Sequence, residues 1–187
     1  MDEVQCQQII PGGMSKILIA YYSRRGQNYV DGVIRDLETG NTEFLARRLA
    51  KMTKGTLFRI DTVKPYPADY HETTKQAMTE LQTDSRPELT DIVEGMEEFD
   101  TIILGYPNWW GTMPMAVHTF LEEYDFSGKR IIPFCTHEGS GAGHSEKDIQ
   151  RLCPSAECLP CEAVRGSAVH SADYSINEII NRINKKY

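Results

Sequence analysis

The sequence predicts an α/β fold in three layers, with helices on both faces of a five-stranded parallel sheet in the order 2-1-3-4-5. Short runs that are apolar throughout alternate along the chain with amphipathic stretches. Strands that are apolar on both sides are typical of parallel sheets that lie between two layers of helices. Right-handed crossovers leave few topologies for about five such strands, and this order is the leading choice.

The first half of the chain supplies two strands and two helices. Residues 16–22 are almost continuously apolar and predict the first strand. In residues 42–54, apolar side chains recur at helical spacing with basic residues on the other face, so we expect a helix there. Residues 56–60 and 69–82 predict the second strand and the second helix.

Three further apolar runs predict strands, and three amphipathic stretches predict helices. The expected strands are residues 101–106, residues 130–135 and, more weakly, residues 159–165. The expected helices are a segment with Val117, Phe120 and Leu121 on one face, residues 145–152 and residues 173–184.

One domain accounts for this pattern. The chain has 187 residues, 40% of them hydrophobic and 25% charged, which is ordinary for a globular domain with a substantial core. No internal repeat or low-complexity segment interrupts it. We therefore expect a domain over residues 15–187, preceded by a disordered leader over residues 1–14.

Charge and composition argue against several classes of protein. A formal net charge of -7 opposes affinity for a phosphate backbone, so no nucleic-acid partner is expected. No window approaches the roughly 20 apolar residues of a transmembrane helix, so no membrane insertion is expected. Five cysteines cannot all pair within one chain, and a reducing, cytoplasmic location is the simpler expectation.

Unusual loops follow the first, third and fourth predicted strands. In a sheet of this order, ligands bind outside the carboxyl ends of the strands, where the strand order reverses. Residues 23–28 and, farther on, 40–42 combine short polar side chains with glycine. Residues 106–112 contain paired tryptophans, and residues 136–143 are rich in glycine. We expect these loops to meet at one edge of the sheet.

Each loop offers a different kind of contact. Ser23, Asn41 and Thr42 are short donors near the start of a helix, whose positive end attracts phosphate. Trp109 and Trp110 have flat faces suited to stacking on a planar ring. Each feature alone has an ordinary explanation, such as an N-cap, a core tryptophan or a flexible connection. The case for a ligand site depends on their convergence.

These loops resemble those of the flavodoxin-like family. Residues 21–24 with 40–43 resemble its phosphate loop, and residues 105–114 and 133–141 resemble the two flavin loops of bacterial members. The resemblance implies a flavodoxin-like fold and a non-covalently bound flavin mononucleotide (FMN). By the same resemblance, the phosphate would be held by Ser23, Asn41 and Thr42, one side of the ring would be lined by Pro107, Asn108, Trp109, Trp110 and Gly111, and its other edge by Thr136, His137, Glu138, Gly139 and Gly141.

One departure from the family pattern lies in the phosphate loop. In flavodoxins the first strand leads directly into the glycine and the helix, whereas here residues 25–39 intervene. Within this arm, Asp31-Gly32 between β-forming residues predicts a hairpin. The arm either covers the flavin or contacts a partner.

Two registers of the phosphate loop are therefore open. The loop is either residues 23–28, or Ser23 joined to Gly40–Thr42, and the second is preferred because Thr42 begins the amphipathic helix. Asn28 would reach the phosphate from the arm, and Arg24 could neutralise it.

The resemblance implies electron transfer through FMN, with redox proteins as partners and no catalytic residue. The alternative is an NAD(P)H-dependent reductase of quinones or similar small acceptors, in which His137 and Glu138 would position substrate or supply a proton. An electron carrier is favoured over an FMN-dependent oxidoreductase, and monomer or homodimer stays open. A phospho-receiver is excluded, because it needs carboxylates where Tyr21 and Tyr22 end the first strand.

No metal site is expected. Cys153, Cys158 and Cys161 have a spacing that resembles an iron–sulfur run, but nothing marks a fourth ligand. Cys161 falls within the predicted fifth strand, which favours buried thiols.

Overall fold

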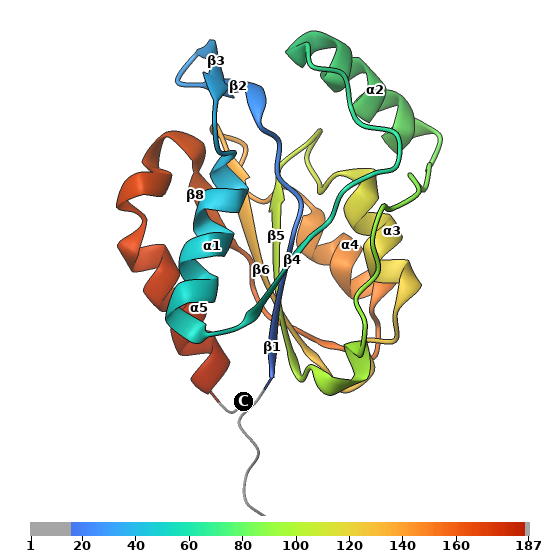
Figure 1. Ribbon diagram of the computed structural model, residues 1–187, viewed down its shortest axis with the longest axis vertical. Coiled ribbons are helices and arrows are strands. Elements are labelled where there is room, and N and C mark those ends of the chain that lie inside the picture. Colours follow the sequence, from blue (N-terminus) through green and yellow to red (C-terminus); the bar gives the residue numbers. More distant parts are fainter. Residues whose placement is uncertain (1–15, 186–187) are drawn as a thin grey trace, which may run out of the picture.

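The computed structural model describes residues 16–185, and the leader expected over residues 1–14 lies outside them. A parallel sheet runs through the middle of the structure with helices on both sides, so the predicted α/β fold is confirmed (Figure 1). In the described part of the chain, no helix is both long enough and apolar enough to cross a membrane.

The elements follow the predicted alternation of strands and helices. The strands are β1 (Ile17–Tyr21), β2 (Gly26–Val30), β3 (Val33–Leu37), β4 (Thr56–Arg59), β5 (Thr101–Pro107), β6 (Arg130–His137), β7 (Glu157–Cys158) and β8 (Glu162–Arg165). The helices are α1 (Asn41–Thr53), α2 (Tyr70–Gln82), α3 (Met115–Glu123), α4 (Ser145–Leu152) and α5 (Asp173–Asn184), with 3-10 turns at Met96–Glu98 and Gly166–Ser171.

The main sheet is parallel, and its strands lie in the order β4-β1-β5-β6-β7, with β8 also pairing with β6. Without the β2–β3 hairpin this corresponds to 2-1-3-4-5 along the chain. The pairing of β1 with β5 is in register from Ile17 opposite Thr101 to Tyr21 opposite Gly105. The strand order reverses between β1 and β5, so the loops that follow these two strands meet there.

The expected fifth strand is broken into β7 and β8, which corrects the prediction of one strand over residues 159–165. Leu159 still donates its backbone N–H to the carbonyl of Ile131 at 2.9 Å. Pro160 follows, and a proline has no N–H to continue the ladder. The backbone N–H of Cys161 turns away to the Glu146 carboxylate at 2.6 Å. Cys161 therefore lies in the break between two strands and not within one.

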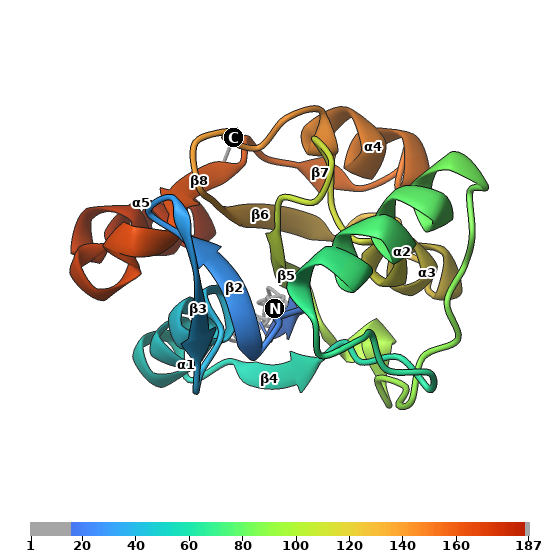
Figure 2. The same ribbon diagram turned by 90° about the horizontal axis from the view of Figure 1, so that it is seen from above.

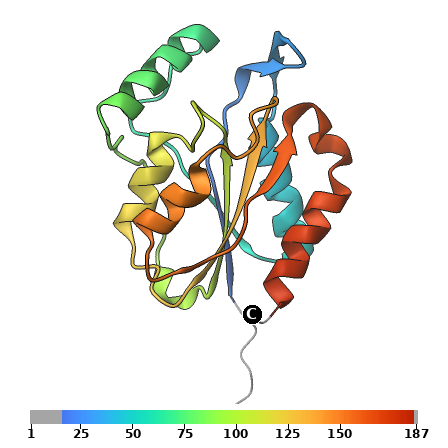
Figure 3. The same ribbon diagram turned by 180° about the vertical axis from the view of Figure 1, so that it is seen from behind.

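Two apolar cores lie on opposite faces of the sheet. Along β1, Leu18 and Ala20 belong to one core, and Ile19 and Tyr21 to the other, as the period of a strand requires. Helices α3 and α4 cover the first face, and α1 and α5 cover the second (Figure 1; Figure 3). Burial of both faces explains why these strands are apolar throughout.

The β2–β3 hairpin and α2 lie beyond the carboxyl ends of the central strands, as the view from above shows (Figure 2). Asp31 and Gly32 have φ angles of 47° and 87°, so the hairpin turns as predicted with both central residues at positive φ. Tyr29 of the hairpin stacks on Tyr70 of α2 with ring centroids 6.3 Å apart. The hairpin and α2 thus contact each other above this edge of the sheet.

Candidate functional site

A cavity of about 300 Å³ opens at the carboxyl edge of the sheet. It is bordered by the loops after β1, β5 and β6, the hairpin, and the starts of α1 and α2. Its lining residues are Ser23, Arg24, Asn28, Tyr29, Asn41, Thr42, Tyr70, Pro107, Asn108, Trp109, Thr136, His137, Glu138, Ser140 and Gly166. The three loops singled out in the sequence therefore do converge on one space.

Ser23 and Thr42 form the inner end of the cavity. Gly40 packs so closely here that a Cβ atom on it would lie 2.3 Å from the Ser23 Oγ and 2.2 Å from the carbonyl oxygen of Arg24. The two segments separated by the hairpin are thus in direct contact. The Ser23 Oγ accepts a hydrogen bond from the backbone N–H of Glu43 at 3.0 Å, and the Oγ1 atoms of Thr42 and Thr136 lie 2.8 Å apart.

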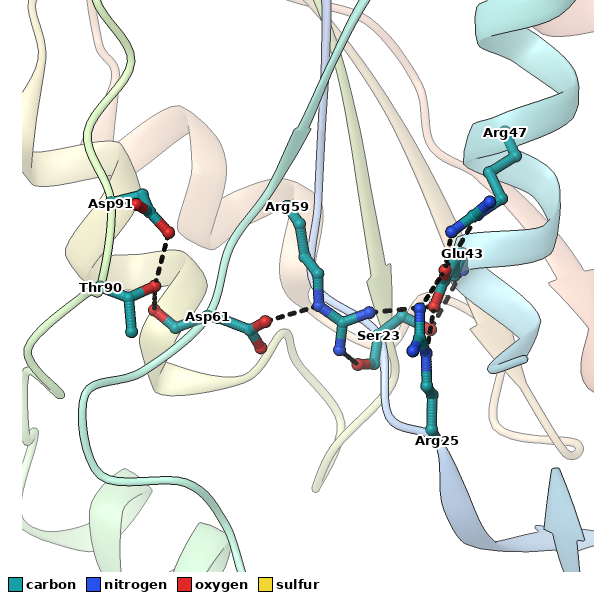
Figure 4. Close-up of polar contacts among 8 residues, drawn as sticks. All are labelled: Ser23, Arg25, Glu43, Arg47, Arg59, Asp61, Thr90 and Asp91. Atoms are coloured by element: carbon teal, nitrogen blue, oxygen red, sulfur yellow. Dashed lines mark hydrogen bonds and ion pairs between the residues drawn. The ribbon is translucent and has the colours of Figure 1, made fainter. Parts of the chain in front are cut away.

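Glu43 is fully buried behind Ser23, and three arginines converge on its carboxylate (Figure 4). Arg25 and Arg47 each place a guanidinium nitrogen 2.7 Å from Oε1, and Arg59 places one 2.9 Å from Oε2. Arg59 also donates to the carbonyl oxygen of Ser23 at 3.0 Å. The loop after β1, helix α1 and strand β4 are therefore joined through one side chain.

Hydrogen bonds from these arginines determine the protonation state of Glu43. The hydrogen bond from Arg25 is the largest influence, and together with Arg47 and Arg59 it lowers the pKa of Glu43 to about 2, against the opposing effect of burial. Glu43 is thus a carboxylate at neutral pH. Arg59 also pairs with Asp61 at 2.6 Å, so three guanidinium groups and two carboxylates leave one net positive charge beside Ser23.

Glu138 faces the cavity with one oxygen unsatisfied. Its Oε1 is buried and has no hydrogen-bond partner among the described residues, while Oε2 accepts from the backbone N–H of Asp31 at 3.3 Å. Gly166 is the reason the carboxylate fits: a Cβ atom there would lie 2.3 Å from Oε1 and 2.4 Å from the Asn41 Nδ2. The Glu138 acceptor and the Asn41 amide donor therefore both pack on Gly166, which has no side chain.

Trp109 forms the apolar wall of the cavity. Its ring meets those of Tyr22 and Tyr66 edge to face, with centroids 5.3 and 5.1 Å away. Asn108, beside it, donates from Nδ2 to the Gly141 carbonyl oxygen at 2.7 Å and accepts the Gly111 N–H at 2.9 Å. Asn108 thus ties the tryptophan loop to the glycine-rich loop.

Trp110 is not in the cavity lining, contrary to the sequence-based assignment. Residues 109–112 form a tight turn, with Trp110 and Gly111 both at positive φ, 55° and 85°. Such turns prefer Asn-Gly, and this conformation costs a residue with a Cβ roughly 1–2 kcal/mol. The turn points Trp110 away from Trp109 and toward α2, where its Nε1 donates to the Thr74 carbonyl oxygen at 2.9 Å.

Several predicted glycines support the cavity without lining it. They are Gly40, Gly111, Gly139 and Gly141, of which the last three have positive φ. The backbone N–H of Gly139 donates to His137 Nδ1 at 2.9 Å, which requires an unprotonated Nδ1. Burial also lowers the pKa of His137, so its imidazole is neutral at pH 7.

Arg24 lines the cavity, but its guanidinium is engaged elsewhere. It donates to the carbonyl oxygens of Gln27, Pro67 and Ala68 and to the Thr73 Oγ1, at 2.6 to 2.8 Å. Arg24 therefore connects the β1 loop to the start of α2, and its role in neutralising a phosphate stays a prediction. Asn28 is held nearby, with Nδ2 donating to the carbonyl oxygens of Arg24 and Gly26.

Sequence reasoning missed four lining residues: Tyr29, Tyr70, Ser140 and Gly166. Tyr29 lies in the predicted hairpin and Ser140 in the third loop, so the sequence already placed both near the expected site. Tyr70 and Gly166 come from segments that only the packing of the chain brings here. Among residues 16–185, no group of three or more His, Cys, Asp and Glu side chains is arranged to hold a metal ion.

Comparison with known proteins identifies relatives of this architecture. The flavodoxin family model matches residues 16–178. A Bacteroides uniformis ATCC 8492 protein proposed to be a flavoprotein is 28% identical, with a TM-score of 0.68 over 91% of this chain and 99% of its own. A similar Bacteroides eggerthii DSM 20697 protein is 26% identical, with a TM-score of 0.66 over 87% of this chain and 98% of its own.

A third structure is a flavoprotein from Lactobacillus acidophilus NCFM solved in complex with FMN. It is 21% identical, with a TM-score of 0.63 over 84% of this chain and 97% of its own, so it supports the fold. No match is found among curated proteins.

Proposed function

Because the chain belongs to the flavodoxin family, we propose that its cavity binds FMN non-covalently and that the protein transfers electrons through it. One observation carries the proposal: a single space combines a hydroxyl-lined helix start, an aromatic wall and an unpaired buried acceptor. These three features match in kind a phosphate, a planar ring and a hydroxylated chain. When bound, FMN would supply the redox chemistry.

The inner end of the cavity fits a phosphate. The N-cap residue of α1 is Gly40, which has no side chain to cap the first turn, and the Ser23 Oγ accepts only the N–H of Glu43 there. Backbone N–H groups at such a helix start, together with the helix dipole, attract anions. Ser23, Asn41 and Thr42 would hold the phosphate there, and the arginines around Glu43 would favour its negative charge.

The middle of the cavity fits the ribityl chain of FMN. An unpaired buried carboxylate oxygen is costly, and a hydroxyl group of a ligand would satisfy it. Glu138 would accept from such a hydroxyl, with the Asn41 amide beside it. Gly166 leaves room for both groups, since a Cβ atom on it would clash with the Glu138 carboxylate and the Asn41 amide.

The outer end fits the edge of a flavin ring. Trp109 and Pro107 would pack against the ring, and the neutral His137 would lie beside it without adding charge. Neutral and apolar walls disfavour extra negative charge on a reduced ring, so these residues would lower its reduction potential.

A carrier and an NAD(P)H-dependent reductase are separated by one test. The oxidised holoprotein should show the absorption bands of flavin and release FMN on heating. Mixing it with NADPH should leave these bands unchanged until a partner reductase is added, whereas rapid bleaching would establish the reductase. A colourless protein that takes up no FMN would contradict both. Redox partner proteins and a cytoplasmic location stay predictions.

A further inference from the structure

A second cavity of about 280 Å³ lies on the other side of Trp109. We call it the α2 groove, because one wall is the face of α2 and the other is the tryptophan turn. Its lining residues are Arg24, Asn28, Tyr70, Thr73, Thr74, Ala77, Asn108, Trp109 and Trp110. Five of these also line the first cavity, so the two spaces adjoin.

Trp110 is the unusual feature of the α2 groove. It occupies a left-handed position that a smaller asparagine would fill with less strain, and 49% of it is exposed. Backbone strain that persists in a folded protein points to a role for the strained residue. In this strained conformation the flat indole of Trp110 is held against α2 by its hydrogen bond to the Thr74 carbonyl oxygen. The groove gains a broad aromatic wall that faces solvent on one side.

Several polar side chains of the α2 groove are already hydrogen-bonded within the protein. Arg24 uses its guanidinium on four protein oxygens, and Thr73 both accepts from Arg24 and donates to the Pro67 carbonyl oxygen. The Asn108 amide is bound at both its nitrogen and its oxygen. All four acceptors of Arg24 are uncharged oxygens, so its guanidinium keeps its positive charge on the side that the groove shares with the first cavity. The rest of the lining offers mainly aromatic and aliphatic contact.

We propose that the α2 groove binds a planar aromatic molecule of about two fused rings, stacked on Trp110. The volume is close to the lower end for small-molecule sites, which suits a ligand of that size. A ring held there lies next to a ligand of the first cavity, because Trp109, Asn108 and Tyr70 border both. Use of the groove for a small reaction partner of the flavin rests on the proposed function, whereas the binding itself does not.

The test uses 2-naphthol and decahydro-2-naphthol, its saturated and non-planar counterpart with the same hydroxyl group. The chain has two tryptophans, so ¹⁵N-labelled FMN-loaded protein gives two indole N–H signals. 2-Naphthol should shift the Trp110 signal saturably, and the saturated alcohol should bind at least about threefold more weakly, since it cannot stack flat on the indole. The absence of a saturable shift, or equal binding of the saturated alcohol, would overturn the proposal.

Variants on α2 show whether the groove is separate from the cofactor cavity. Thr74→Phe fills the groove and should weaken 2-naphthol binding at least about tenfold while FMN affinity stays within about threefold. Thr79→Phe makes the same change on the same helix outside the groove and should bind 2-naphthol like the unmodified protein. Trp110→Asn relaxes the turn and should fold normally but lose 2-naphthol binding, which in this variant is followed by the backbone amide signals of α2.

Two outcomes separate failure of the groove from failure of the proposed function. If Thr74→Phe weakens FMN and 2-naphthol equally, the groove is part of the cofactor site and the proposal is wrong. If the protein binds 2-naphthol but no FMN, the groove is supported and the proposed function is contradicted.

Discussion

The two ends of the site are built in opposite ways. At the inner end, Glu43 is fully buried, and hydrogen bonds from three arginines connect it to α1, β4 and the Ser23 loop. At the outer end, Trp110 is half exposed, lies at positive φ and has one hydrogen bond to α2. The inner end is fixed by charge and burial. At the outer end, the strained backbone lowers the stability of the fold but exposes an aromatic surface.

The largest effect is expected from Glu43→Ala. Removing one partner of a buried ion pair leaves the other charges unpaired and typically costs about 3–5 kcal/mol. Arg25 and Arg47 are each more than half exposed, and water compensates them in part, so we expect a loss of about 2–3 kcal/mol. Denaturant unfolding measures this, with Tyr174→Ala on exposed α5 surface as the control. A loss below about 1 kcal/mol would show that the inner end is not fixed by Glu43.

The stability of the protein should fall in acid because of the same residue. The pKa of Glu43 is lowered to about 2 in the folded protein, below the usual range of a glutamate. Its contribution is therefore present at neutral pH and is lost as the pH falls from about 4.5 through about 2. Glu43→Gln should flatten this part of a stability–pH profile. An unchanged slope in Glu43→Gln would assign the acid sensitivity to other carboxyl groups.

Gly166→Ala should weaken FMN binding about tenfold, or about 1.4 kcal/mol, with a smaller effect on folding. The new Cβ would displace the Glu138 carboxylate and the Asn41 amide from the space between the two ends. Flavin fluorescence during titration measures the affinity. Ser167→Ala, at the exposed neighbouring position, is the matched control and should bind FMN normally. Equal affinity in both variants would remove Glu138 and Gly166 from the proposed site.

The smallest effect concerns the tryptophan turn. Trp110→Asn relieves the left-handed strain, roughly 1–2 kcal/mol, but loses a hydrogen bond of about 1 kcal/mol. Trp110→Phe loses the bond and keeps the strain. Thermal unfolding should therefore find the asparagine variant more stable than the phenylalanine variant by about 1 kcal/mol. The reverse order would mean that the turn at the outer end is not strained.

Much of the fold follows from apolar patterning, because strands buried on both faces leave a strong signal. The break in the fifth strand does not follow from this pattern. Residues 159–165 were expected to form one strand, and the missing N–H of Pro160 has an effect only because the neighbouring strand β6 lacks a donor there. The hairpin was readable from Asp31-Gly32, since that pair suits a turn at positive φ.

Prediction of the site was limited by packing. Ser23 and Thr42 could be joined from the sequence, because Thr42 begins a helix with a clear apolar face. Trp109 and Trp110 could not be told apart, since only a turn of the backbone places Trp109 between the two cavities and Trp110 in the α2 groove alone. Gly166 carries no sequence signal, because its role depends on Glu138 in the loop after β6 and Asn41 at the start of α1.

Titration of cofactor-free protein with FMN and with riboflavin tests the central claim most directly, because riboflavin lacks the phosphate. One FMN should bind per chain, at least about tenfold more tightly than riboflavin, since the Ser23 and α1 end is built for an anion. Equal affinity for the two flavins, or no saturable uptake of FMN, would contradict the account.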